Sequence, residues 1–199
     1  MIHNIIEILK EYLPNKLKTY HSILRQACTG ERLEELIASV LAENGHNNDW
    51  QPKKKHTISK DITLENGMSF SVKSGIYNPE KNILTFSGSR LGKHDTREDM
   101  VSSVISNSAD YYICVSRVDQ EWSVFPDFFD TKKYHLFVFP SSALRYDSEW
   151  FSKYSAKGKP THYMDVEGMS AFISYSMSYQ LWTNISLDII GSPHKFDII

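Results

Sequence analysis

The pattern of apolar positions changes along the chain from a helical period to a strand period. Over the first 45 residues, apolar side chains recur every three or four positions, which predicts three helices. The first covers 2–13 and is expected to end at Pro14, because proline inside a helix removes a backbone hydrogen bond. The second is predicted over 16–28.

The third helix is predicted from Gly30 to about Asn44, between two residues that favour helix ends. Thr29 can cap the first turn with its hydroxyl, and Gly45 can adopt the left-handed conformation that often follows a helix. A polar loop over 46–55 follows and ends in a run of lysines.

Beyond this loop, apolar and polar residues alternate, which is typical of strands. A helix over 95–107 interrupts the alternation, and a helix near 167–178 and a strand near 179–190 are predicted after it. The segments with the stronger strand pattern are 57–64, 68–74, 82–87, 110–117, 121–126 and 134–140. This order predicts one α/β domain, residues 1–199, around a mixed central sheet flanked by helices.

Composition adds mainly exclusions. The 199 residues carry 22 Lys+Arg and 24 Asp+Glu, a net charge of −2, so a nucleic-acid surface would require clustered basic residues. No apolar run reaches the roughly 18–20 residues of a transmembrane helix, and we expect no membrane partner. Cys28 and Cys114 lie far apart without a Cys-x-x-Cys pattern, which argues against a disulfide scaffold or zinc site and favours a reducing cytoplasm.

The segment 61–73 predicts a hairpin with two alternative registers. A two-residue loop at Asn66-Gly67 would pair Glu65 with Met68 and mix polar and apolar side chains on each face. A three-residue loop with a left-handed Gly67 pairs Leu64 with Met68 instead. We expect the second register because it gathers the apolar side chains on one face. These are Ile62, Leu64, Met68, Phe70 and Val72.

The other face of this hairpin carries three side chains that suggest chemistry. Asp61 lies opposite Ser71 and diagonal to Lys73, within about 5–8 Å. Glu34 lies at the edge of the apolar stripe of the third helix and can reach over the sheet. A solvated polar face, and a Glu34 paired with a neighbouring basic residue, would give the same pattern.

In these residues the chain resembles the PD-(D/E)xK nuclease superfamily, and type II restriction endonucleases most of all. A helix with Gly30-x-x-x-Glu34 precedes a strand with Asp61, and Ser71-Val72-Lys73 ends the next strand. The resemblance covers roughly 28–117.

The chain departs from the family pattern at two positions. Lys60 stands where the family has proline, and Ser71 stands where it usually has an acidic residue. A Ser-x-Lys variant needs a carboxylate from elsewhere, and Glu34 is the first choice because a helix packed behind the hairpin can deliver it. The other candidates are Glu80, Glu65 and Glu98.

The resemblance implies a restriction-endonuclease-like core over 57–117, preceded by N-terminal helices (1–45) and followed by additional strands and a helix (118–199). It implies a Mg²⁺-dependent, sequence-specific endonuclease that cuts double-stranded DNA as a homodimer in a prokaryotic cytoplasm. Asp61 and Glu34 would hold Mg²⁺. Lys73 would orient water or stabilise developing charge, and Ser71 would position a carboxylate or a metal-bound water.

Basic and small residues near this core are candidate DNA contacts. They could equally belong to solvated loops or surface salt bridges. The candidates are Lys54, Lys55, Lys60, Ser89, Arg90, Lys93 and His94.

Three other functions are compatible with the same residues. The first is a structure-specific repair or junction-resolving nuclease. The second is a catalytically inactive nuclease-like module that binds DNA or protein, which the serine at position 71 would explain. The third is a protein-interaction domain in which the motif is incidental.

Overall fold

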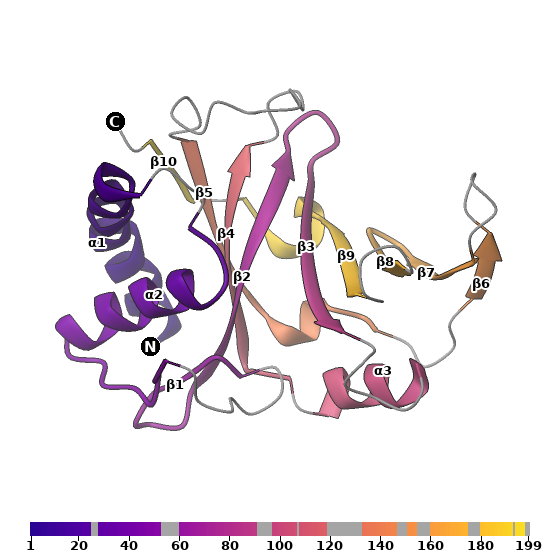
Figure 1. Ribbon diagram of the computed structural model, residues 1–199, viewed down its shortest axis with the longest axis horizontal. Coiled ribbons are helices and arrows are strands. Elements are labelled where there is room, and N and C mark those ends of the chain that lie inside the picture. Colours follow the sequence, from indigo (N-terminus) through magenta and orange to yellow (C-terminus); the bar gives the residue numbers. More distant parts are fainter. Residues whose placement is uncertain are drawn as a thin grey trace.

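The protein is built on one mixed, ten-stranded sheet, seen in the computed structural model (Figure 1). The structure describes residues 1–24, 28–52, 60–90, 97–106, 108–118, 133–146, 151–154, 160–174, 180–192 and 194–197. The strands are β1 (Ile62–Thr63), β2 (Ser69–Asn78), β3 (Ile83–Arg90), β4 (Tyr111–Val118), β5 (Lys133–Pro140), β6 (Phe151–Tyr154), β7 (Pro160–Val166), β8 (Met169–Ser174), β9 (Gln180–Ser186) and β10 (His194–Asp197). The helices are α1 (Ile2–Ile23), α2 (Glu31–Glu43), α3 (Arg97–Ser106) and α4 (Leu187–Ile190).

The strand order is β10-β5-β4-β2-β3-β9-β8-β7-β6, and β1 pairs with β2 outside this path. β2 and β4 run parallel, while the other pairings between described strands are antiparallel. The α/β class with a mixed central sheet is therefore confirmed.

α1 is one helix of 22 residues, so the prediction that Pro14 ends it is wrong. A buried stripe continues past the proline, and its packing outweighs the lost hydrogen bond. Lys10, whose carbonyl loses that bond, is exposed and can be solvated. The stripe consists of Ile5, Leu9, Leu13, Leu17 and Tyr20.

α2 lies where the third helix is predicted, with a different start. Gly45 follows its end with φ +82°, as expected. The cap at Thr29 is wrong, because Gly30 occupies the N-cap position and makes no side-chain cap hydrogen bond.

The strands predicted over 68–74, 82–87, 110–117 and 134–140 are β2 to β5, although β2 continues to Asn78. The helix over 95–107 is α3. The segment 57–64 contributes only β1 among its described residues, and 121–126 lies outside the described residues.

The helix predicted near 167–178 is wrong over the described part of this segment, because Met169–Ser174 form β8. Met169, Ala171 and Ile173 are buried and alternate with half-buried residues, which is the period of a strand. The strand predicted near 179–190 is β9 followed by the short helix α4.

The two faces of the sheet bury two separate hydrophobic clusters. α1 and α2 pack together against one face, to which β2 contributes Phe70 and Val72 (Figure 1). The opposite face includes Tyr77, Tyr112 and Cys114. Among the described helices, none is both long and apolar enough to cross a membrane.

Candidate functional site

The hairpin of β1 and β2 has the three-residue loop that burial favours. Leu64 donates its N–H to the carbonyl of Met68 at 2.9 Å, and Gly67 has φ +87°. Ile62 pairs with Phe70, so the same register places Asp61 opposite Ser71. The expected register is confirmed.

Asp61 lies where two strands share one edge of β2. β4 pairs with β2 from Phe70 to Tyr77 and occupies one edge, so β1 and β3 must both use the other. β1 pairs with β2 up to Phe70, and β3 begins to pair at Gly75. We call the part of this edge between the two strands, residues 71–74, the fork.

The Asp61 carboxylate bonds to β2 at the fork. Its Oδ2 accepts hydrogen bonds from the Val72 N–H at 2.7 Å and from the Ser71 hydroxyl at 3.1 Å. The Lys73 ammonium donates to the same oxygen at 3.2 Å and to the Val72 carbonyl at 3.1 Å. An anion, a cation and a hydroxyl therefore meet at one point, as the sequence predicts.

These side chains are largely removed from solvent. The Lys73 and Asp61 side chains are 20% and 15% exposed, and Ser71 is fully buried. The alternative of an ordinary solvated polar face is therefore wrong. Such burial strengthens the attraction between the two charges, because less water screens them.

Two further residues on β4 lie next to this cluster and were missed by the sequence analysis. Tyr112 is the register partner of Ser71, and Cys114 is the partner of Lys73. Burial raises the pKa of Tyr112, and the nearby Tyr146 and Asp61 raise it further. Burial also raises the pKa of Cys114, against a smaller opposing effect of Lys73. In the sequence, only their spacing of two residues within a predicted strand indicates that Tyr112 and Cys114 share a face.

The expected second carboxylate, Glu34, lies on α2 and not on the strands that form the fork. Glu34 is half-buried in the first turn of α2, which packs on the face of Phe70 and Val72. Ser71 and Lys73 alternate with those residues and point to the other face. The role of Glu34 thus stays a prediction.

The structure separates two alternative carboxylates from the fork. Glu80 follows the far end of β2, and Asn78 alone is about 16 Å from Lys73 at 3.3 Å per residue. Glu65 lies at the hairpin loop, where it accepts a hydrogen bond from Asn47. Glu98 belongs to the first turn of α3. Among the described residues, no group of three or more His, Cys, Asp or Glu is arranged to hold a metal ion.

The candidate DNA contacts divide into three groups. Lys60 is half-buried and precedes Asp61 directly. Ser89 and Arg90 end β3, where the register with β9 shifts between Ser87 and Arg90. Lys54, Lys55, Lys93 and His94 lie outside the described residues.

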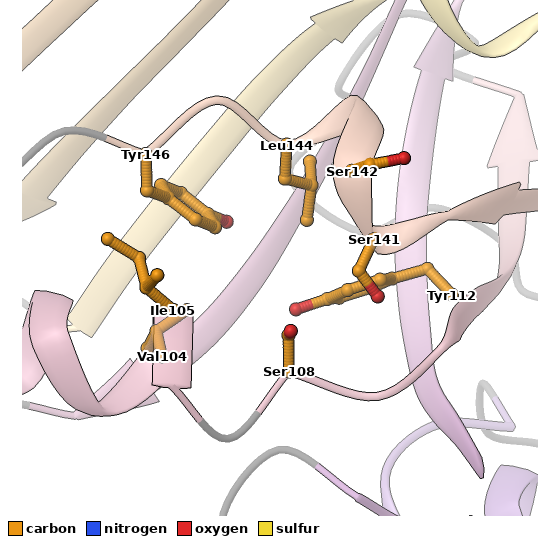
Figure 2. A pocket seen from close by; sticks show the side chains of 8 residues that line it. All are labelled: Val104, Ile105, Ser108, Tyr112, Ser141, Ser142, Leu144 and Tyr146. Atoms are coloured by element: carbon orange, nitrogen blue, oxygen red, sulfur yellow. The ribbon is translucent and has the colours of Figure 1, made fainter.

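A cavity of about 280 Å³ lies near Asp61, Ser71 and Lys73. It is on the face of the sheet that includes Tyr112 (Figure 2). It is formed by the end of α3, the start of β4 and the segment after β5. Its lining residues are Val104, Ile105, Ser108, Tyr112, Ser141, Ser142, Leu144 and Tyr146.

Comparison with protein-family models and with curated protein sequences found no match for this chain.

Proposed function

We propose that this protein is a Mg²⁺-dependent endonuclease that hydrolyses phosphodiester bonds of double-stranded DNA at specific sequences. The observation that carries the proposal is the convergence of Asp61, Ser71 and Lys73 at the fork. A carboxylate, a lysine and a hydroxyl at one point can serve a reaction that needs charge stabilisation and an oriented water.

The oxygen atoms at the fork fit a hard cation. Asp61 Oδ2 and the Val72 carbonyl both accept from the Lys73 ammonium, so one positive group already bridges them. Asp61 Oδ1 has no hydrogen-bond partner among the described residues. Mg²⁺ prefers oxygen ligands and is often held by only one or two carboxylates with waters. Asp61 and the Val72 carbonyl would hold it, with waters completing its coordination.

When bound, Mg²⁺ polarises a phosphate oxygen and lowers the pKa of a coordinated water. The residues of the chain supply orientation and charge. Ser71 and the Val72 N–H hold the Asp61 carboxylate in one orientation. The Lys73 ammonium can orient the attacking water or stabilise negative charge that develops on the phosphate.

Sequence specificity and a two-fold dimer belong to the same proposal. β9, β8 and β7 extend the sheet well beyond the fork and provide surface that phosphate hydrolysis alone does not require. A two-fold homodimer would bring one active site to each strand of a palindromic target. The candidate contacts for DNA are the basic residues preceding Asp61 and the end of β3.

A catalytically inactive, DNA-binding module is the second candidate. It is favoured by the ion pair at the fork, in which the Lys73 ammonium lies 3.2 Å from Asp61 Oδ2 and already neutralises its charge. This candidate predicts DNA binding without metal-dependent cleavage.

The decisive experiment incubates the protein with unmethylated phage DNA in Mg²⁺ and in EDTA. Lys73→Ala is compared with Lys81→Ala, a matched control that removes an exposed lysine from the turn after the same strand. Discrete bands are expected with the parent protein and Lys81→Ala in Mg²⁺, and no cleavage is expected with Lys73→Ala or in EDTA. The thermal unfolding midpoint of each variant verifies that it is folded.

The other results separate the candidates. A smear that depends on Mg²⁺ and Lys73 would contradict sequence specificity and favour a structure-directed or nonspecific nuclease. Undamaged DNA in every lane, with DNA binding retained, would favour the inactive module. Equal cleavage by Lys73→Ala and Lys81→Ala would overturn the assignment of the fork.

A further inference from the structure

The hydroxyl of Tyr112, whose ring is buried, lines the cavity beside the fork. Tyr112 is 4% exposed, yet its hydroxyl has no hydrogen-bond partner among the described residues. Figure 2 shows this hydroxyl and that of Ser108 directed into the same space. A hydroxyl that lines the cavity and makes no hydrogen bond to the described residues is available to a ligand that enters the cavity.

The cavity lining suits an uncharged ligand with flat apolar faces and a polar edge. Among the described residues, those that line it carry no charge. Val104, Ile105 and Leu144 supply apolar surface, and the Tyr146 ring adds an aromatic wall (Figure 2). Hydroxyl groups can donate or accept, so Ser108 and Tyr112 can both bond to the edge of a heteroaromatic ring.

The size of the cavity favours one ring system over a whole nucleotide. Its volume of about 280 Å³ lies just below the usual range of pockets for drug-sized ligands, roughly 300–1,000 Å³. The lining residues that the structure describes include no cation to bind a phosphate, which also favours a base over a nucleotide.

The position of the cavity connects it to the fork. Asp61, Ser71 and Tyr112 lie on three neighbouring strand positions across β1, β2 and β4. Two strand spacings separate Asp61 from Tyr112, about 10 Å. This distance equals roughly three nucleotide steps along one DNA strand.

We propose that this cavity binds a single uncharged nucleobase, held at its edge by Tyr112 and Ser108. The choice of a nucleobase over other planar rings rests on the proposed function. The base comes either from DNA, rotated out of the duplex beside the fork, or from a free nucleoside. Enzymes that rotate a base out of DNA receive it in pockets with this combination of stacking surfaces and polar groups.

The test measures binding in EDTA, so that it does not depend on cleavage. The probes are the fluorescent nucleosides of 2-aminopurine and pyrrolocytosine, and short duplexes in which either base stands opposite an abasic site. A base without a pairing partner leaves the stack at the lowest cost. We expect saturable binding with a change in fluorescence for at least one base, from the duplex, the nucleoside or both.

Two variants test the cavity directly. Tyr112→Phe should weaken probe binding about fivefold, the effect of one hydrogen bond. Ser108→Leu should abolish it by filling the cavity. The matched control is Tyr77→Phe, which removes a hydroxyl from another buried tyrosine on the same face but outside the cavity. Its probe affinity should equal that of the parent protein.

The outcomes distinguish this proposal from the nuclease proposal. Probe binding in EDTA does not depend on whether the parent protein cleaves DNA, and Lys81→Ala, outside both the fork and the cavity, should bind the probes normally. Binding of the duplex but not the nucleoside would identify DNA as the source of the base, and the reverse would identify a small-molecule ligand. No binding of any probe, or equal losses in Tyr112→Phe and Tyr77→Phe, would overturn the proposal.

Discussion

Tyr112 and Tyr146 line the same cavity, but their hydroxyls have different surroundings. Tyr146 shares a hydrogen bond of 2.7 Å with the Thr183 hydroxyl, and burial raises the pKa of Tyr146 to about 12. The Tyr112 hydroxyl has no such partner among the described residues. Two chemically identical substitutions should therefore have different consequences for stability.

Tyr112→Phe should change the free energy of unfolding by less than about 0.5 kcal/mol, because it breaks no hydrogen bond within the described residues. Tyr146→Phe should cost about 1–3 kcal/mol, because it leaves the fully buried Thr183 unpaired. Urea unfolding of both variants measures the difference. Equal losses would contradict the assigned hydrogen-bond pattern.

At the same scale, the sequence was sufficient to predict which side chains meet at the fork. Asp61, Ser71 and Lys73 follow from alternation and from burial of the apolar hairpin face. Tyr112 does not, because its proximity to Ser71 depends on β4 pairing in parallel with β2. That pairing joins segments about 40 residues apart in the chain.

At the scale of the element, substitution of Pro14 in α1 measures how much a proline inside a helix lowers the free energy of unfolding. Pro14→Ala should raise the free energy of unfolding by about 1–3 kcal/mol, because it restores a helix hydrogen bond and removes a steric clash. The measurement is urea unfolding. Pro79→Ala, in the exposed turn after β2, is the control and should not stabilise the protein. A Pro14→Ala variant no more stable than the parent would indicate that α1 has adapted fully to its proline.

The end of α1 should make stability depend on pH. Burial lowers the pKa of His21, which shares a hydrogen bond of 2.6 Å with Tyr134, and the backbone at Leu24 partly opposes this. The unfolded chain therefore binds this proton more readily, at an ordinary pKa of about 6.5. Stability from this group is complete above that value and falls as the pH drops toward the lowered pKa.

The thermal unfolding midpoint, followed from pH 8 to pH 5, measures this effect. The decline should be smaller in His21→Gln than in the parent protein. His3→Gln, which removes an exposed histidine from the same helix, should leave the decline unchanged. An unaltered decline in His21→Gln would show that other groups control it, including His194, whose pKa burial also lowers.

At the scale of the whole molecule, β2 is the strand on which both hydrophobic clusters and the fork depend. Gly75 lies where β2 passes between β3 and β4. A Cβ at this position would lie 2.9 Å from Cys114 Sγ and 3.0 Å from both Leu84 Cδ1 and the Thr85 carbonyl oxygen. The close packing of three strands therefore requires glycine here.

Gly75→Ala should lower the free energy of unfolding by about 1–3 kcal/mol, because the backbone carbonyl among its neighbours cannot move aside cheaply. Chemical denaturation measures the loss. Gly88→Ala in β3 is the matched control, since its new Cβ would meet nothing closer than 3.8 Å. A loss in Gly88→Ala as large as in Gly75→Ala would contradict the packing argument.

The sequence by itself determined the features that depend on neighbouring residues. Helical and alternating periods located α2, α3 and four central strands, and burial of one hairpin face selected its register. Such patterns are local, because each side chain's direction follows from its place within a few residues. The convergence of Asp61, Ser71 and Lys73 is a consequence of that register alone.

Only the tertiary structure decided which distant segments meet. α1 continues past Pro14 because its buried stripe packs along its whole length. The fork lies beside Asp61 because β1 and β3 pair with different parts of the same β2 edge. The cavity likewise brings together α3, β4 and the segment after β5. These features depend on packing free energy summed over segments far apart in the chain, which no local pattern contains.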